Sequence, residues 1–129
     1  MNSSKPIRVT SFDHYIEVEM SGFLEVGSEA YFSELQSLVG LNTGPIGLLY
    51  SMSEVQGYAR EVAIAHAQRF RELLPALTGI AVVSTTGVVR IGITFVAMLS
   101  GAKMKGFDTR AEALEWLESL QRQAKASSI

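Results

Sequence analysis

The 129-residue chain contains no cysteine, only two aspartates (Asp13 and Asp108) and only two histidines (His14 and His66). Without cysteine it can form no disulfide, no thiolate nucleophile and no cysteine-ligated zinc or iron–sulfur site. The shortage of aspartate and histidine leaves few groups for acid–base or metal chemistry. We therefore expect no catalytic residues, no metal and no cofactor, and the composition favours binding over catalysis.

The chain also lacks an excess of charge and a long apolar run. Eleven basic and 13 acidic residues give a net charge of −2, so no basic field for nucleic acid or an anionic membrane is expected. The most apolar stretch, Val88–Leu99, contains Arg90 and is shorter than the roughly 20 residues of a transmembrane helix. Met1–Arg8 is polar, unlike a signal peptide, and we expect a cytoplasmic protein.

What the chain does contain is enough apolar residues for a core. The hydrophobic fraction of 47% is too high for a disordered chain, and the length favours one domain. We expect that domain to cover residues 6–122. The polar or small residues at 1–5 and 123–129 are expected to form flexible tails.

Two kinds of spacing alternate along the sequence. Residues of period two or short apolar runs predict strands, and apolar residues at i, i+4 and i+7 predict helices. The predicted strands are Ile7–Phe12, Tyr15–Met20, Ile46–Tyr50, Ile80–Ser84 and Lys103–Phe107. The predicted helices are Ser28–Val39, Tyr58–Leu74, Val88–Ser100 and a last one from Asp108-Thr109 to about Gln121, and Ser51–Gly57 is predicted to be a polar loop.

The order of these elements predicts the fold class. A hairpin at the start is followed by alternating strands and helices, which is typical of a mostly parallel sheet with helices packed on it. We therefore expect an α/β fold with a single mixed five-stranded sheet, an N-terminal antiparallel hairpin and four helices.

Several of these segments resemble a known family. The ending GFDTRAEALEWL resembles the last strand and helix of SpoIIAA-like (STAS-like) domains, and GIAVVSTTGVVRIG resembles their fourth strand and next helix. The resemblance extends from about Ile7 to Leu120. The residues that carry the first and last parts of it are Gly22, Tyr31, Phe107, Ala113, Trp116 and Leu117.

The resemblance implies a small α/β domain related in architecture to anti-anti-sigma regulators and to CRAL-TRIO-type lipid carriers, neither of which is an enzyme in the usual sense. It therefore implies a regulatory or protein-interaction module, or else a carrier of a lipid-like molecule. Anti-anti-sigma regulators carry an Asp-Ser-Ser-Gly-like sequence with a phosphorylated serine after the third strand, whereas this chain has YSMSEVQGYAR. Ser53 is the corresponding candidate for phosphorylation.

The predicted helix Val88–Ser100 is apolar over more of its circumference than a surface helix needs. On a helical wheel one sector is expected to face the core, and Val89, Ile93 and Val96 extend the apolar arc beyond it. This surplus surface could meet a neighbouring helix, a second subunit of a homodimer, another protein or an apolar ligand. The residues assigned to the core sector are Val88, Ile91, Phe95, Met98 and Leu99.

Polar residues are expected at the carboxyl ends of two neighbouring parallel strands, where open α/β sheets bind ligands. They could form the mouth of a pocket, or they could be a helix N-cap, a turn and a solvated loop. A third interpretation is an enzyme that uses Ser51, Ser53, Tyr58 and Arg60. The residues of the predicted mouth are Ser51, Ser53, Tyr58, Thr85, Thr86 and Arg90.

Overall fold

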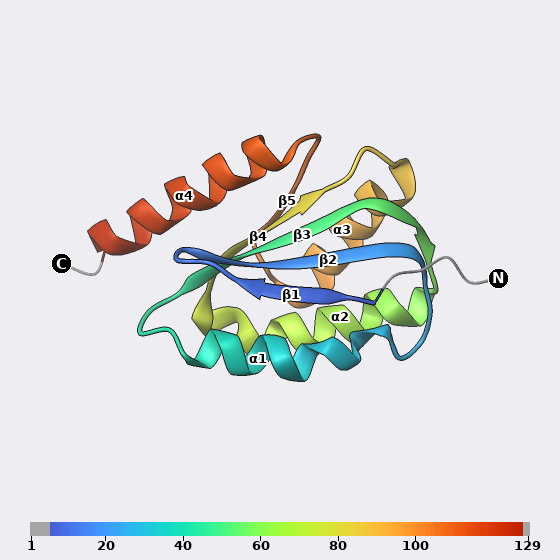
Figure 1. Cartoon of the computed structure of the whole chain (residues 1–129), viewed down its shortest axis with the longest axis horizontal. Coiled ribbons are helices and arrows are strands. Elements are labelled where there is room, and N and C mark those ends of the chain that lie inside the picture. The colour runs from blue at the N-terminus through green and yellow to red at the C-terminus, as the bar shows by residue number, and fades with distance from the viewer. Residues whose placement is uncertain (1–5, 128–129) are drawn as a thin grey trace.

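The computed structural model describes residues 6–127 and contains one five-stranded sheet in the order β1-β2-β3-β4-β5 (Figure 1). β1 pairs with β2 in antiparallel orientation, and the remaining pairs are parallel. The predicted α/β class with a mixed sheet and an N-terminal hairpin is thereby confirmed. The strands are β1 (Arg8–Ser11), β2 (Tyr15–Leu24), β3 (Ile46–Tyr58), β4 (Leu77–Val83) and β5 (Met104–Phe107).

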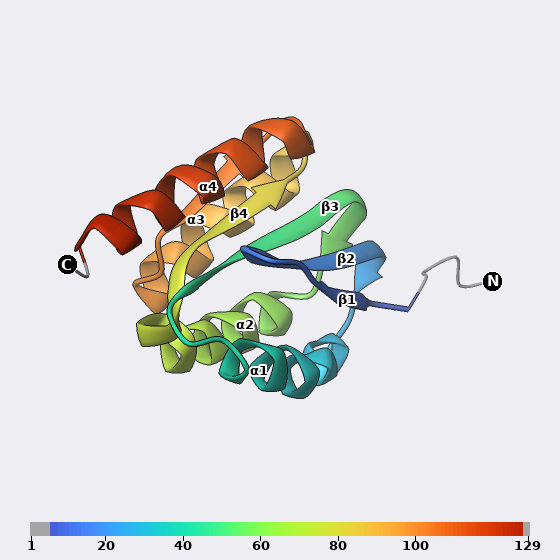
Figure 2. The ribbon, with the colours of Figure 1, turned by 60° about the vertical axis from the view of Figure 1, so that its left-hand side comes forward.

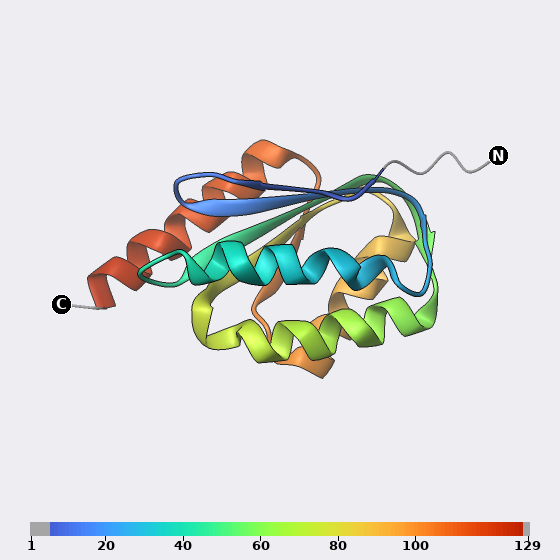
Figure 3. The ribbon, with the colours of Figure 1, turned by 60° about the horizontal axis from the view of Figure 1, so that its bottom comes forward.

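Three of the four predicted α-helices cover one face of this sheet. α1, α2 and α3 each connect one parallel strand to the next in the same direction across the sheet, and connections of one hand place such helices on the same face. α2 lies between α1 and α3, and α4 covers the opposite face (Figures 2 and 3). The helices are α1 (Phe32–Gly40), α2 (Arg60–Leu73), α3 (Gly87–Ser100) and α4 (Arg110–Ser127), with 3-10 turns at Ser28–Tyr31 and Leu74–Ala76.

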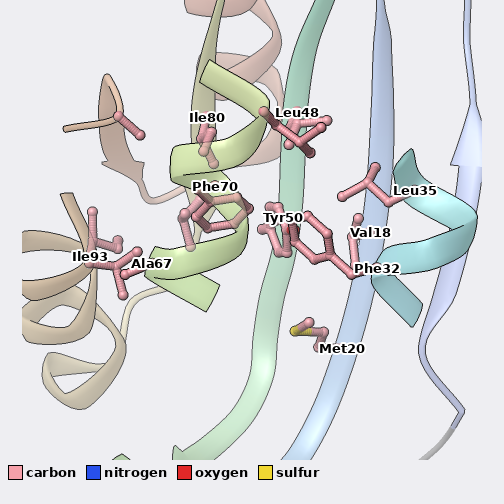
Figure 4. Close-up of a cluster of buried hydrophobic side chains, with 14 of the residues drawn as sticks. Val18, Met20, Phe32, Leu35, Leu48, Tyr50, Ala67, Phe70, Ile80 and Ile93 are labelled. Carbon is pink, nitrogen blue, oxygen red and sulfur yellow. The ribbon is translucent and has the colours of Figure 1, made fainter. Parts of the chain in front are cut away.

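The two faces of the sheet contribute to two separate cores. The larger core joins alternate residues of β2, β3 and β4, such as Val18, Leu48 and Ile80, to the inner sides of α1, α2 and α3. Figure 4 shows Phe32, Tyr50 and Phe70 at its centre. The smaller core holds Leu49, Ala81, Val83, Ala113 and Leu117, between the sheet and α4.

β3 is much longer than predicted, and this corrects the predicted loop at Ser51–Gly57. The strand continues to Tyr58 and remains paired with β2, from Ser21↔Glu54 to Leu24↔Tyr58. The polar residues of this segment indicated a loop, but this part of the sheet extends beyond β4 into solvent, where a strand needs few apolar residues. We call residues 21–24 and 54–58 the β2–β3 arm.

The last helix is anchored at its start and extends further than predicted. Thr109 caps the helix: its Oγ1 accepts the N–H of Glu112 (3.2 Å), and the Thr109 hydroxyl donates to Glu112 Oε1 (3.0 Å). Arg110 then binds Glu17 of β2, with Nη2 2.8 Å from Oε1. Residues 123–127, predicted to belong to a flexible tail, continue the helix because no glycine or proline interrupts it. Residues 1–5 and 128–129 lie outside the described part of the chain.

Candidate functional site

α3 begins directly after the fourth strand of the sheet and ends at a glycine. Its N-cap residue, Thr86, has extended backbone angles, and the hydroxyl of Ser84 accepts the Thr86 N–H at 3.2 Å. Gly101 follows the helix with φ +77°, and its N–H donates to the carbonyl of Ala97. A left-handed residue at this position is the usual helix stop, which glycine adopts without steric cost.

The inner face of α3 is the opposite of the predicted one. Val89, Ile93 and Val96, which were predicted to form the outer surface, are buried against α2 and the sheet. Figure 4 shows Ile93 beside Ala67 of α2. A helix that is apolar nearly all round gives no periodicity to choose its inner face, which is the physical reason for the error. The usable indicators were the small residues Gly92 and Ser100, which lie on the buried side.

Gly92 is on that side because an aromatic ring occupies the space of its missing side chain. A Cβ atom at Gly92 would lie 2.5 Å from the hydroxyl oxygen of Tyr58 in the β2–β3 arm. That hydroxyl donates a hydrogen bond to the carbonyl of Val88, at 3.2 Å. The arm and α3 are thus joined by one ring that lies against helix backbone.

The outer face of α3 carries large apolar side chains in solvent. Ile91 is 71% exposed and Met98 79% exposed, and the other members of the set are between a third and a half exposed. We call this set the α3 outer face. It consists of Val88, Ile91, Phe95, Met98 and Leu99.

No charged side chain belongs to the α3 outer face. The one charged residue of the helix, Arg90, is turned toward β4 and β5, where its Nε donates to the Ser84 carbonyl (2.8 Å). Its Nη2 lies 2.6 Å from Asp108 Oδ1, so Asp108 pairs with Arg90 instead of capping α4. The five members of the outer face therefore present only hydrocarbon and thioether groups, and exposed Thr94 lies at their border.

A cavity of about 70 Å³ lies beneath α3, between its inner face, α2 and the sheet. Val89, Ile93 and Val96 line it, so the residues predicted to contact a ligand or partner do border a space, but on the inside of the protein. Its walls are almost entirely apolar. The remaining lining residues are Met20, Leu24, Tyr50, Met52, Tyr58, Val62, Ala63, His66, Phe70, Val82, Gly92 and Met104.

Three titratable side chains form a hydrogen-bonded network beside this cavity. His66 Nδ1 lies 2.9 Å from the carbonyl of Val62, so this nitrogen carries the proton and donates it. His66 Nε2 then accepts from the hydroxyl of Tyr31 at 3.0 Å, and Tyr31 accepts from the hydroxyl of Tyr50 at 2.5 Å. Every polar atom of the network has a partner, and the His66 ring is neutral.

Burial shifts the pKa of each member of this network in the direction that favours its uncharged form. Desolvation lowers the pKa of His66, and the hydrogen bond to Val62 only partly opposes this. Desolvation raises the pKa values of Tyr31 and Tyr50. This network could not be predicted from the sequence, because its members lie on three separate elements.

The residues of the predicted polar mouth do not converge on one point. Ser53 and Thr86 border the same surface groove, and Ser51 and Ser53 border a second one near β1. Tyr58 instead lines the apolar cavity, and Arg90 is paired with Asp108. Thr85 is exposed, as is Ser53 in β3, whose phosphorylation stays a prediction, and Arg60 is exposed at the start of α2.

Within residues 6–127, no three or more histidine, aspartate or glutamate side chains gather in a way that could hold a metal ion. Over the same residues, no helix combines the length and the apolar character needed to cross a membrane.

Comparison with known proteins places the chain in a family. A family model described as SpoIIAA-like matches residues 15–118. No curated protein matches the sequence. Among solved structures, an uncharacterised protein with a SpoIIAA-like fold from Shewanella loihica is similar, with a TM-score of 0.68 and 18% identity over 91% of this chain and 97% of its own. An anti-sigma factor antagonist from Mycobacterium paratuberculosis has a TM-score of 0.60 and 19% identity over 87% and 92% of the two chains. The chain belongs to the SpoIIAA-like family, as its sequence motifs had suggested.

Proposed function

We propose that the protein is a non-enzymatic regulatory module that binds a protein partner through the α3 outer face. The observation that carries this proposal is the exposure of five large apolar side chains on one side of one helix. At roughly 150–200 Å² for a fully exposed large side chain, their exposed fractions correspond to on the order of 500 Å² of apolar surface. Patches of this size on soluble proteins often mark interaction sites.

Two further observations favour binding over chemistry. The buried titratable groups Tyr31, Tyr50 and His66 are hydrogen-bonded to one another and to backbone. In addition, one of the similar structures is named as an anti-sigma factor antagonist, which is a protein defined by its action on another protein. We propose a cytoplasmic setting for the interaction, which fractionation of cells that produce the tagged protein would test.

A carrier of a lipid-like molecule is the second candidate, and the cavity beneath α3 is the observation that favours it. Size argues against it, because a dry apolar cavity known to bind benzene measures about 150 Å³, and this one measures about 70 Å³. An acyl chain would have to displace α3 from α2. Native mass spectrometry of the purified protein tests this function, since a carrier retains a bound lipid and a protein-interaction module does not.

The test of the interaction uses two variants with matched exposure. Met98 is 79% exposed on the α3 outer face, and Leu41 is 80% exposed just after α1. We expect a partner recovered with the tagged wild-type protein from its native cells to be lost with Met98→Glu and kept with Leu41→Glu. Recovery of the same partners by all three proteins would show that the α3 outer face is not the binding site.

A further inference from the structure

The α3 outer face has the spacing of a coiled-coil seam. Its first four members, at positions 88, 91, 95 and 98, follow one another at intervals of three, four and three residues. These are the intervals of alternating a and d positions in a heptad, which allow the side chains of one helix to fit between those of another helix. The fourteen residues of α3 provide two heptads.

We propose that the partner of this face is a second copy of the chain, whose α3 packs antiparallel against the first across a two-fold axis. This inference rests on the proposed function, because it names the partner of the same surface. Most soluble oligomers are symmetric dimers in which the same patch of both subunits forms the interface. A patch can serve in that way only if it is complementary to itself.

Charge is the first reason why this face is complementary to itself. When a surface meets its own copy, each charged residue near the axis meets an identical charge. The α3 outer face contains no charged residue, and Arg90 is held away from it by Asp108. Arg71 of α2, near the end of the helix, donates to the carbonyl of Leu99 and so is engaged by the C-terminus of α3.

Area is the second reason. The face of each copy offers on the order of 500 Å² of apolar surface, so two copies together would remove at most about 1,000 Å² of apolar surface from water. This is about the size at which specific protein–protein interfaces begin. A short segment of another chain would cover the face only in part, whereas a second α3 has the same length and the same seam.

The antiparallel orientation follows from the sizes of the side chains. It places Val88 opposite Met98 of the other copy and Ile91 opposite Phe95, which pairs a smaller side chain with a larger one at each level. A parallel pair would instead place each Phe95 against its own copy, and Met98 likewise. The antiparallel orientation also brings opposite ends of the two helix dipoles together.

The oligomeric state in solution is the first test. Sedimentation velocity of the purified wild-type protein should show a monomer–dimer equilibrium that shifts to the dimer as concentration rises. Met98→Glu places a charge in the apolar seam of both copies and should raise the dimer Kd by roughly 100-fold or more. Leu41→Glu should leave Kd unchanged. A wild-type protein that stays monomeric up to about 500 µM (a Kd near the weak end of the affinity scale) overturns the proposal.

Disulfide trapping tests the orientation, and the absence of cysteine from the chain makes any engineered cysteine unique. Under mild oxidation, a mixture of Val88→Cys and Met98→Cys proteins should form mainly the heterodimer. Each variant alone should crosslink poorly. Rapid crosslinking of Met98→Cys with itself would overturn the antiparallel arrangement.

The dimer and the proposed function can fail separately. If the wild-type protein is a monomer and still loses a cellular partner on Met98→Glu substitution, the second copy is wrong and the proposed function stands. If the dimer forms equally well in Met98→Glu and Leu41→Glu, it uses another surface and the second copy is wrong. If Met98→Glu also keeps every cellular partner that Leu41→Glu keeps, the proposed function fails as well. Circular dichroism and thermal unfolding should show that each variant is folded, as expected for substitutions of exposed residues.

Discussion

The buried histidine of the Tyr31–Tyr50–His66 network should make the stability of the protein sensitive to mild acid. In the folded protein the pKa of His66 is lowered, chiefly by burial, whereas in the unfolded chain it returns to about 6.5. Below that pH the unfolded state binds a proton that the folded state does not bind. The free energy of unfolding must therefore fall as the pH falls through and below about 6.5.

The size of this effect has an upper limit that follows from linkage. If the folded protein takes up no proton on His66 between pH 7.5 and pH 5.5, the loss of stability is about 1.4 kcal/mol over that interval. Protonation of the folded state would also be costly in structural terms. Nε2 accepts from Tyr31, so a proton there would force the hydroxyls of Tyr31 and Tyr50 to reorient.

Urea denaturation at pH 7.5 and pH 5.5 measures this loss. His66→Gln removes the titrating group and should lower stability at both pH values while removing most of the difference between them. His14→Gln changes the other, exposed histidine and should keep the full difference. Equal pH dependence in the wild type and in His66→Gln would refute the assignment of the effect to His66.

Two further predictions concern contacts that hold α3 and α4 in place. Gly92→Ala should destabilise the protein by about 1–3 kcal/mol, since the new Cβ would clash with Tyr58. In a Tyr58→Ala background the same change should be neutral or stabilising, because alanine is the better helix former. Thermal unfolding of the wild type, the two single variants and the double variant measures this cycle. Arg110→Ala should lower the free energy of unfolding by about 1–3 kcal/mol in urea denaturation, because it leaves the mostly buried carboxylate of Glu17 without its partner. Arg122→Ala removes an exposed pair with Glu118 and should lower it by well under 1 kcal/mol.

Much of the fold could be predicted from the sequence, because apolar residues repeat with one spacing in strands and with another in helices. The apolar patterns alone predict the buried runs Ile46–Tyr50 and Ile80–Ser84 and the helix between them. The part of β3 after Tyr50 could not be predicted in this way. It is polar because it extends beyond the end of β4, and the spacing of residues in the sequence does not show where β4 ends. The pairing with β2 that makes it a strand is a long-range contact.

The candidate site could be predicted only in part. The sequence shows that α3 is more apolar than a surface helix needs, but the predicted outer face was wrong, since Val89, Ile93 and Val96 are buried. The direction depends on Tyr58, which lies 34 positions before Gly92 in the chain and fits only against a residue without a side chain. The pairing of Tyr31 with His66 likewise requires knowledge of how α2 lies against the turn that precedes α1.

The division of the protein into two cores also has a consequence for partial unfolding. All five described strands and the three helices of the larger core precede Arg110 in the chain, and the smaller core is completed only by α4. If α4 detaches while the larger core stays intact, the sheet is covered on one side and bare on the other. Leu49, Ala81 and Val83 then form an exposed apolar strip on which another copy of the chain can aggregate. Docking of this one helix therefore protects the sheet against aggregation.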